Sequence, residues 1–307
     1  ISFLRQNHIH GEILHGDPEY VGRRMEMLAA AYEAKDKLRN FKLAVIGAPS
    51  DWLIASEADR DVIHRQLGIE LIDIPFEELL ATIKQTPETF AIETSNVEIS
   101  QKALPGANSI YKALKSLLEK YGLQGYTLRC FDLLSTVQNT GCLAAAKLNA
   151  EGYVAGCEGD IPSMITMAIT RTLTNMSGFL ANPANINPES GEMLFAHCTI
   201  PFDMVERYEL DTHYESGLGV GVRGFMKEGP VTIFKIGGDL KRNFVAEGRL
   251  LMSLALPNLC RTQQVILLKD KSQAQYFLTH PIGNHHLIMP GRKRTLLEQA
   301  LNILLQH

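Results

Sequence analysis

The chain has 307 residues, of which 45% are hydrophobic and 21% are charged, close to the averages for globular proteins. This composition excludes a disordered chain, a collagen-like repeat and a coiled coil, and the length predicts about two domains. Thirty basic residues against 34 acidic ones give a net charge of −4. The sequence therefore lacks the basic character that nucleic-acid binding requires, and we expect no nucleic-acid partner.

The sequence also carries no sign of a membrane span or a secretory leader. The apolar run at 250–256 stops at Pro257, well short of the about 18 residues needed to cross a bilayer. Arg5 interrupts the first apolar stretch, unlike the core of a signal peptide. The five cysteines are odd in number and widely spaced, which favours reduced thiols over a disulfide framework. We expect a cytoplasmic protein with no membrane partner.

The first two thirds of the chain alternate between helical and strand patterns. The spacing of apolar residues and the capping signals predict helices over 17–38, 56–68, 76–84, 109–121, 140–150 and 160–175. Short apolar runs that end at turn residues predict strands over 41–47, 69–74, 126–131 and 153–157. Strands that alternate with helices indicate parallel βαβ units.

The pattern changes near residue 178. Asn, Pro, Gly and Ser crowd the segment 178–191, and strand-like runs follow at 193–200, 231–236 and 263–268, with a helix only at 296–305. We therefore expect a parallel, Rossmann-like α/β region followed by a mainly antiparallel β domain from about residue 190, either a barrel or a sandwich. A cleft is expected between the two layers.

A literal GxGxxG occurs at Gly219, Gly221 and Gly224. A dinucleotide-binding fingerprint needs a preceding strand and a helix that opens at the third glycine. The downstream residues lead into a strand instead, so the pattern favours a tight turn or a bulge. A nicotinamide-dependent dehydrogenase would rest on this triplet alone.

Two carboxylates follow the strand at 153–157. Glu158 lies within a tight strand-to-helix turn, and Asp160 precedes the next helix. Ligands in parallel α/β sheets bind beyond the carboxyl ends of the strands, so Glu158 is placed to face a cleft. Asp160 is expected to cap the helix through its backbone N–H groups.

Histidines supply further candidates. His197 lies in an apolar strand, where a buried structural histidine is the alternative to a functional one. His285 and His286 are adjacent, and neighbouring strand residues face opposite ways, so we expect only one to point into a given site. His213 and Glu215 are expected to share one face of a strand, as a site or as a solvated face.

Several segments together resemble the L-fucose isomerase and L-arabinose isomerase superfamily, in particular its fucose-isomerase-like branch. They are TyrValAlaGlyCysGluGlyAsp at 153–160, PheAlaHisCysThrIlePro at 195–201, HisTyrGluSerGlyLeuGlyValGly at 213–221 and GlyAsnHisHis at 283–286. The segments 47–56 and 129–134 also fit. The similarity covers most of the chain from about residue 38.

The resemblance implies an α/β domain followed by a C-terminal β-barrel domain. Residues 1–38 would then be the remnant of an N-terminal α/β domain, residues 39–190 the central α/β domain and residues 191–307 the barrel. The junction before residue 38 looks short for the family, as though a helix were missing. Relatives form symmetric oligomers, so a homo-oligomer is expected.

The resemblance also implies aldose–ketose isomerisation with a divalent ion, usually Mn²⁺, where the domains meet. Glu158 would then bind the metal and relay a proton. His286, favoured over His285 by the register, would complete the metal shell. Asp160 or His197 would be the assisting catalytic acid.

One position departs from the family pattern. Asn182 stands where relatives carry a second acidic ligand, and an amide oxygen is neutral and cannot act as a base. We expect Asn182 to be a weak metal ligand or a partner of a sugar hydroxyl. The sequence thus predicts a metal-dependent isomerase acting on a free sugar such as L-fucose or L-arabinose through an enediolate. A non-catalytic sugar-binding or regulatory protein is the alternative.

Overall fold

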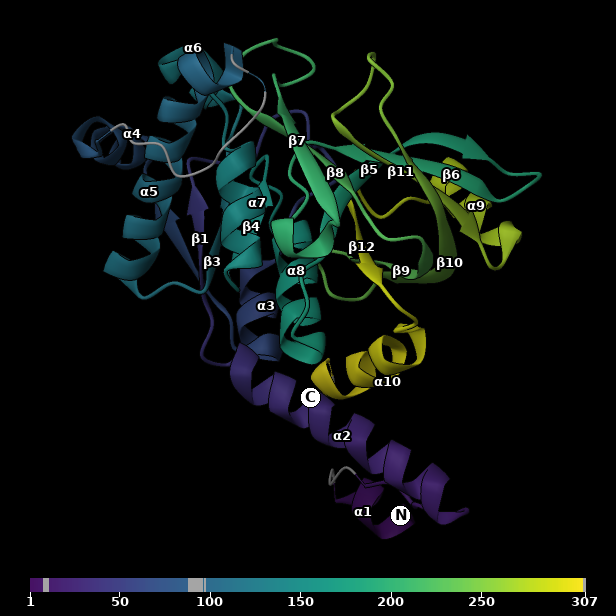
Figure 1. Ribbon diagram of the computed structural model, residues 1–307. Helices are drawn as coiled ribbons and strands as arrows, with labels where there is room; N and C mark the ends of the chain where they lie inside the picture. Colours follow the sequence, from purple (N-terminus) through teal and green to yellow (C-terminus); the bar gives the residue numbers. More distant parts are fainter. Residues whose placement is uncertain (8–10, 88–95, 97, 306–307) are drawn as a thin grey trace.

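The computed structural model describes residues 1–7, 11–87, 96 and 98–305. It contains a parallel four-stranded sheet flanked by helices and a closed antiparallel β-barrel in the C-terminal half. Figure 1 shows the two layers side by side, with the sheet on one side and the barrel on the other. The expected fold class, a Rossmann-like α/β region followed by an antiparallel barrel, is confirmed.

The parallel sheet has the strand order β2-β1-β3-β4. Its strands are β1 (Lys42–Ile46), β2 (Glu70–Ile74), β3 (Gly125–Leu128) and β4 (Val154–Cys157). The N-terminal and central helical segments are α1 (Ser2–Gln6), α2 (Pro18–Leu38), α3 (Arg60–Leu67), α4 (Phe76–Gln85), η1 (Ile99–Ala103), α5 (Leu104–Tyr121), α6 (Asp132–Val137), α7 (Cys142–Ala150) and α8 (Ile161–Thr174). All three strand pairs are parallel, so their carboxyl ends share one edge of the sheet.

The barrel closes in the order β10-β11-β6-β5-β12-β9, and β7 and β8 form a separate ribbon. The strands are β5 (Phe179–Asn187), β6 (Glu192–His197), β7 (Arg207–Asp211), β8 (Gly221–Phe225), β9 (Gly229–Ile236), β10 (Asn243–Leu254), β11 (Thr262–Leu268) and β12 (His286–Pro290). The helical segments of this half are η2 (Phe202–Met204), η3 (Lys271–Gln273), α9 (Ala274–Thr279) and α10 (Arg294–Leu304).

Helix α8 joins the two layers. It packs against β3 and β4 on the sheet side and against β9 and β12 on the barrel side. Ten consecutive residues at its start, 161–170, are buried, as expected of a helix that is apolar all round. Asp160, at the start of α8, therefore lies where the edge of the parallel sheet meets the barrel.

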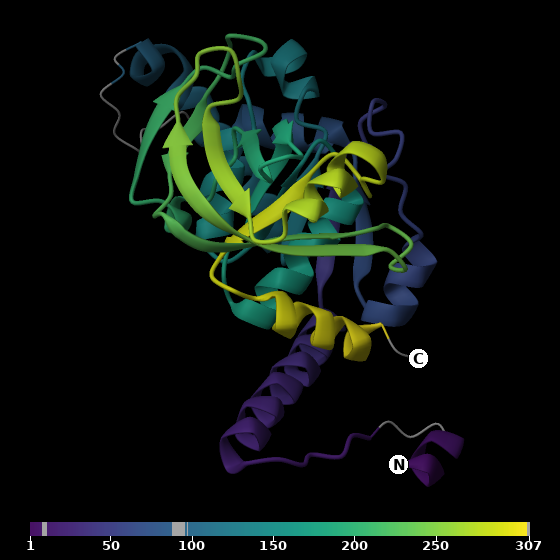
Figure 2. The same ribbon diagram turned by 90° about the vertical axis from the view of Figure 1, so that its right-hand side faces the viewer.

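The helix α2 extends away from the body. Figure 2 shows α2 projecting below the barrel, with α10 packed across its inner half. Its buried residues, Ala31, Ala34 and Leu38, all belong to that inner half.

The sequence predicted most elements of the sheet layer, including α2, β1, β2, α4 and α8, to within a few residues. Helix α5 begins earlier than expected, and α3 begins later, after the Asp59 cap. Strands β5, β7, β8, β10 and β12 lie outside the strand ranges that the sequence predicted. Strand β5 was not predicted because the Asn and Pro residues of the segment 178–191, which favour turns, lie in the more exposed second half of this strand.

Two of the sequence motifs lie in β8 and in the segment before it. Gly221 and Gly224 lie in β8 and are followed by β9 rather than by a helix, whereas Gly219, with a φ of 59°, lies in the preceding turn. The expected turn is therefore found at Gly219, and the other two glycines belong to a strand. The strand predicted for His213 and Glu215 is wrong, because both lie in the turn between β7 and β8. His213 is buried there, whereas Glu215 is exposed.

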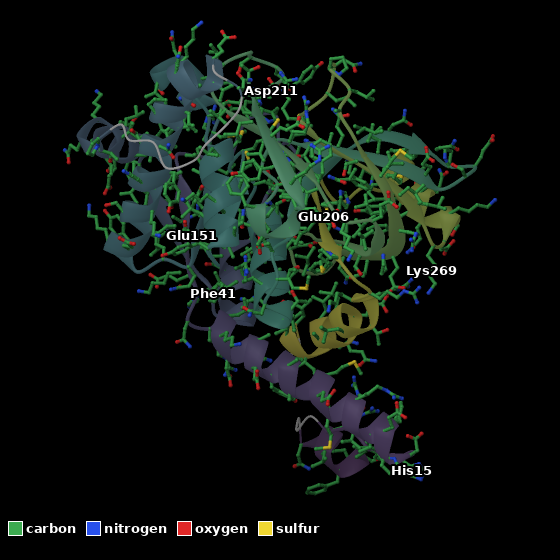
Figure 3. The ribbon with its side chains drawn as sticks, in the orientation of Figure 1. His15, Phe41, Glu151, Glu206, Asp211 and Lys269 are labelled. Atoms are coloured by element: carbon green, nitrogen blue, oxygen red, sulfur yellow. The ribbon has the colours of Figure 1, made fainter. Side chains whose placement is uncertain are left out.

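No helix in the described part of the chain is long and apolar enough to cross a membrane. Charged side chains such as Lys269 and Glu206 lie on the outside of the molecule, as Figure 3 shows.

Gly159, in the turn after β4, should be intolerant of any side chain. Its φ is 72°, and a Cβ there would lie 2.6 Å from both the Ala48 carbonyl oxygen and Pro49 Cα. We expect Gly159→Ala to lower the free energy of unfolding by about 3 kcal/mol, from backbone strain plus collision. Urea unfolding would measure the loss.

Gly122→Ala is the matched control, because Gly122 has a φ of 62° with nothing within 4 Å of an added Cβ. Only the backbone penalty of about 1 kcal/mol applies there. Equal losses in the two variants would show that the close approach at Gly159 contributes nothing.

Candidate metal centre

The candidate site begins at the turn that follows β4. Glu158 has a φ of 61°, an uncommon conformation for a residue with a side chain. The turn is closed by a hydrogen bond from the Asp160 N–H to the Cys157 carbonyl (3.1 Å), and the Glu158 carbonyl accepts one from the Ser50 N–H (3.0 Å). The backbone thus fixes the direction of the Glu158 side chain at the carboxyl end of the sheet, where the sequence analysis expected it.

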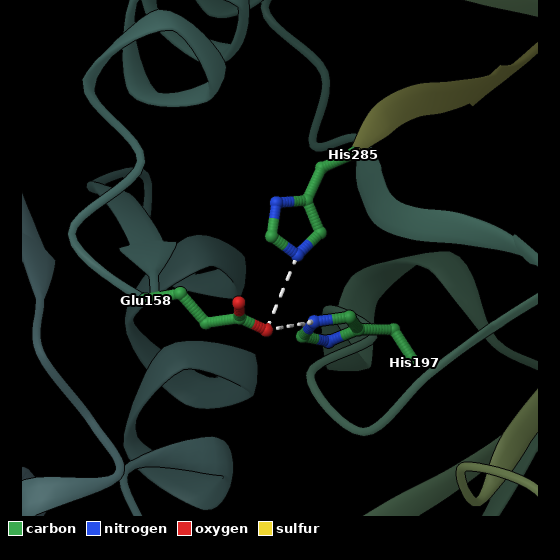
Figure 4. A group of neighbouring side chains, drawn as sticks. All are labelled: Glu158, His197 and His285. Carbon is green, nitrogen blue, oxygen red and sulfur yellow. Dashed lines mark ion pairs between the residues drawn. The ribbon is translucent and has the colours of Figure 1, made fainter. Parts of the chain in front are cut away.

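Two histidines from the barrel side converge on the Glu158 carboxylate, as Figure 4 shows. Oε1 of Glu158 lies 3.3 Å from Nε2 of His285 and 3.8 Å from Nε2 of His197. The potential ligand atoms of the three residues all lie within 4.8 Å of one another. The Glu158 side chain is 12% exposed, whereas that of His285 is fully buried. We call Glu158, His197 and His285 the three-residue cluster.

The structure brings His285, and not His286, to Glu158. Alternation in β12 explains the choice. Ile288 belongs to the apolar cluster inside the barrel, whereas Leu287 belongs to the core shared with α8. His286 has the same parity as Ile288 and His285 the same parity as Leu287, so His285 faces α8 and the end of β4.

His286 instead lies among the aromatic side chains of the barrel. Its Nε2 is 2.9 Å from the Tyr276 hydroxyl, and its ring contacts Phe277 and Phe244. Burial and the nearby Lys235 charge lower the pKa of His286 to about 3, so its ring is neutral. In the part of the chain that the structure describes, no hydrogen bond or ion pair joins His286 to Glu158, so the expected pairing is not among the contacts of His286.

Asp160 contacts His285 on the side of the ring that faces away from Glu158. Its Oδ1 caps α8 by accepting the Ser163 N–H (2.8 Å), as predicted, and its Oδ2 lies 2.9 Å from Nδ1 of His285. Lys235, which the sequence analysis did not single out, donates to the Ser163 hydroxyl (2.7 Å) and lies 3.7 Å from Asp160. Asp160 is fully buried, with its Oδ2 against the His285 ring. The sequence feature that could have identified Lys235 is its position as a charged residue within an otherwise apolar strand.

His197 ends β6, and its ring is also oriented by a neighbour. Nδ1 of His197 lies 2.9 Å from the Thr199 hydroxyl, which leaves Nε2 facing Glu158. The ring packs edge to face on His285, with centroids 5.2 Å apart. In both histidines Nδ1 therefore contacts a neighbouring side chain, Thr199 or Asp160, and Nε2 faces the Glu158 carboxylate. This arrangement is typical of metal-binding histidines.

Opposite charges in the cluster shift its pKa values. Burial raises the pKa of Glu158, but the neighbouring imidazoles of His197 and His285 outweigh it and lower that pKa well below its usual range. Burial lowers the pKa of His285, but Asp160 and Glu158 together raise it to about 9. Without a metal, His285 is therefore protonated at neutral pH and Glu158 is ionised.

A loop after β1 covers the other oxygen of Glu158. The indole N–H of Trp52 donates to Oε2 at 2.9 Å, and the ring, about half exposed, packs edge to face on Phe131. Arg129 fixes this loop by donating to the Pro49 carbonyl (3.0 Å) and pairing with Asp51 (2.9 Å). Trp52 lies within a segment that carries the resemblance, but no local pattern predicts its contact with Glu158.

A small pocket lies beside the cluster. Its lining residues are Cys130, Phe131, Leu134, Thr140, Cys142 and His213. The His213 ring packs edge to face on Phe131, and burial lowers the pKa of His213. A neutral imidazole and the Trp52–Phe131 pair thus stand near Glu158.

Asn182 lies in β5, opposite Ala196 of β6 in the register of the barrel. It is half-buried. Among the described residues, no hydrogen bond or ion pair joins Asn182 to Glu158, His197 or His285.

The three-residue cluster fits a divalent ion. One carboxylate and two imidazole nitrogens are a donor set suited to first-row transition ions such as Mn²⁺. Nε2 of His285 is buried without a hydrogen-bond partner of good geometry in the described chain, as expected of a nitrogen that serves as a ligand.

The comparisons with known proteins agree with part of the sequence analysis. Residues 65–178 match the family model of the L-arabinose isomerase central domain. The match includes Glu158 and Asp160 and ends before His197. It supports a relationship to the sugar isomerases, without distinguishing the fucose-isomerase-like branch. A search of curated proteins found no match.

The raised pKa of His285 should make the metal-free protein less stable at high pH. Because the folded pKa of about 9 lies above the ordinary value of 6.5, the contribution of protonated His285 is complete below pH 6.5. It is lost as the pH rises towards 9 and amounts to about 3 kcal/mol at most. Urea unfolding at pH 6, 7.5 and 9 in the presence of a chelator would measure it.

His285→Gln should lack this part of the pH dependence, whereas His280→Gln, at an exposed position, should retain it. A pH profile unchanged by His285→Gln would contradict the buried ion pairing with Asp160 and Glu158.

Proposed function

We propose that the protein is a metal-dependent aldose–ketose isomerase acting on a free sugar such as L-arabinose or L-fucose. The observation that supports this most strongly is the convergence of Glu158, His197 and His285 beside a central-domain segment similar to that of L-arabinose isomerase. The proposed metal ligands are these three residues, with His285 in place of His286. We propose Mn²⁺ as the ion, on the family resemblance.

Isomerisation moves a proton between C1 and C2 of the sugar through an enediolate. A bound divalent ion supplies Lewis acidity that stabilises the negative charge of such an intermediate. Glu158 is the residue placed to hold and move the proton, because its carboxylate is the ionised group of the cluster that retains some exposure. Trp52 fixes the orientation of that carboxylate through Oε2.

Asp160 and His197, expected from the sequence to assist catalysis as acids, receive different proposed roles. Asp160 is a positioning residue for His285, since it is buried behind the ring. His197 is a ligand oriented by Thr199. We propose His213, which lines the adjacent pocket, as the assisting acid or base, because burial lowers its pKa and keeps the ring neutral.

Asn182 was the feature that favoured a non-catalytic binder. No hydrogen bond or ion pair joins it to the three-residue cluster in the described chain, so the proposed ligand set does not depend on its neutral amide. We therefore favour the enzyme. We further propose that the boundary between the central and barrel domains, expected at residue 190, lies instead between α8 and β5, because β5 belongs to the barrel. As the resemblance implies, we also propose that the protein is cytoplasmic and forms a homo-oligomer.

The direct test is incubation with a panel of aldoses and Mn²⁺, with detection of ketose. We expect turnover that a chelator abolishes and that Glu158→Gln reduces at least about 10²-fold, the usual contribution of a proton-transferring group. Circular dichroism should show that the variant remains folded. Undiminished turnover in Glu158→Gln would refute the assignment, and metal-independent sugar binding without turnover would favour the binder.

Metal binding should release a proton from His285. The protein has a single tryptophan, Trp52, which contacts Glu158, so quenching of its fluorescence by Mn²⁺ reports binding directly. With the pKa of His285 near 9, the apparent affinity should rise about tenfold per pH unit between pH 6 and 8.

His285→Gln should lose both the binding and its pH dependence, whereas His286→Gln should keep both. The opposite pattern would restore His286 as the ligand. Affinity that is independent of pH in the unaltered protein would contradict proton release on binding.

A further inference from the structure

Two cysteines meet directly behind Glu158. Sγ of Cys130 and Sγ of Cys157 lie 3.1 Å apart in the buried space between the ends of β3 and β4. Leu128 pairs with Cys157 in the parallel register, so Cys130 follows two residues beyond the paired strand and its side chain reaches across. The separation exceeds an S–S bond of about 2.05 Å by about one ångström, so formation of a disulfide requires Cys130 or Cys157 to move.

Of the two cysteines, Cys130 borders a pocket. Cys130 lines the small pocket beside the three-residue cluster, and Cys157 does not appear in that lining. Cys130 is 9% exposed and Cys157 is 6% exposed. A small oxidant that enters the pocket therefore meets Cys130 first, with Cys157 in place behind it.

The backbone transmits a change at Cys157 to Glu158. Cys157 immediately precedes Glu158, and its carbonyl is held by the Asp160 N–H (3.1 Å) and the Thr127 hydroxyl (3.2 Å). Glu158 itself has positive φ. A turn constrained in this way has little freedom to absorb a displacement of Cys157 without moving the carboxylate.

We propose that Cys130 and Cys157 are a site of reversible oxidation by hydroperoxides, in which a disulfide forms and displaces Glu158. The Cys130 thiolate attacks the distal oxygen of the hydroperoxide, giving a sulfenic acid and releasing the alcohol, or water from hydrogen peroxide. The Cys157 sulfur then attacks the sulfenic sulfur, and water leaves as the disulfide forms. A thiol reductant reverses the reaction. The covalent step is independent of the proposed isomerase function, whereas its effect on metal affinity rests on it.

All five cysteines are free in the structure, so the reduced protein has five thiols to count. Treatment of the reduced, metal-free protein with hydrogen peroxide should lower the titratable thiols from five to three. Peptide mapping should find Cys130 linked to Cys157. Dithiothreitol should restore all five.

Two serine variants give the matched comparison. Cys130→Ser should retain all four of its thiols under the same treatment, whereas Cys260→Ser should still lose two. Cys260 is the informative control, because its thiol interacts with Cys198, the residue after His197. Five thiols remaining in the unaltered protein, loss of two thiols in Cys130→Ser, or a mapped Cys198–Cys260 link would each overturn the proposal.

The effect on Glu158 is measured by Mn²⁺ quenching of Trp52 fluorescence. The disulfide form should bind Mn²⁺ at least about tenfold more weakly than the reduced form, and reduction should restore the affinity. Equal affinity in the two forms would overturn the displacement of Glu158 while the thiol count still decides the covalent step. If the reduced protein does not bind Mn²⁺, the metal site fails, and displacement is then decided by whether oxidation alone changes Trp52 emission.

Discussion

The candidate site depends on one buried interaction, between Asp160 and His285. Asp160 belongs to the start of α8 and His285 to the loop before β12, so their 2.9 Å contact joins the sheet layer to the barrel. Both side chains are fully buried, where an unpaired charge would be costly. Lys235 and the Ser163 hydroxyl complete the pairing. This network holds Nε2 of His285 towards Glu158 and so determines the geometry of the cluster.

The second constraint is the turn that carries Glu158. A carboxylate at the end of β4 faces the barrel only because residues 158 and 159 both adopt positive φ, and because Gly159 lets the loop after β1 approach closely. That loop then brings Trp52 to the other carboxylate oxygen. The positive φ of Glu158 is thus accompanied by contacts from three separate segments, namely the loop after β1, His197 and His285. Strained backbone held in place by its surroundings is usual at functional sites.

The parallel layer was predictable from sequence because its signals are local. Caps such as Asp17-Pro18 and Asp160, and apolar runs ended by glycine, define helices and strands without knowledge of their partners. The barrel was predictable only in outline. Strand β5 is buried at one end and exposed at the other, and its Asn and Pro residues resemble a loop until the neighbouring strands are known.

The site shows the same division. Glu158 and Asp160 were predictable because they follow a strand and open a helix. The choice between His285 and His286 was not, since it depends on which face of β12 meets α8, and that parity follows from barrel closure rather than from local pattern. Trp52 and Lys235 reach the site from distant segments, and only tertiary packing brings them there.

The most direct measurement is anomalous X-ray scattering at the manganese edge from crystals soaked in Mn²⁺. We expect one strong peak about 2.2 Å from the Glu158 carboxylate and from Nε2 of both His197 and His285, bond lengths ordinary for such ligands. A peak bound to Asn182 and His286, or no peak between the sheet and the barrel, would contradict this expectation.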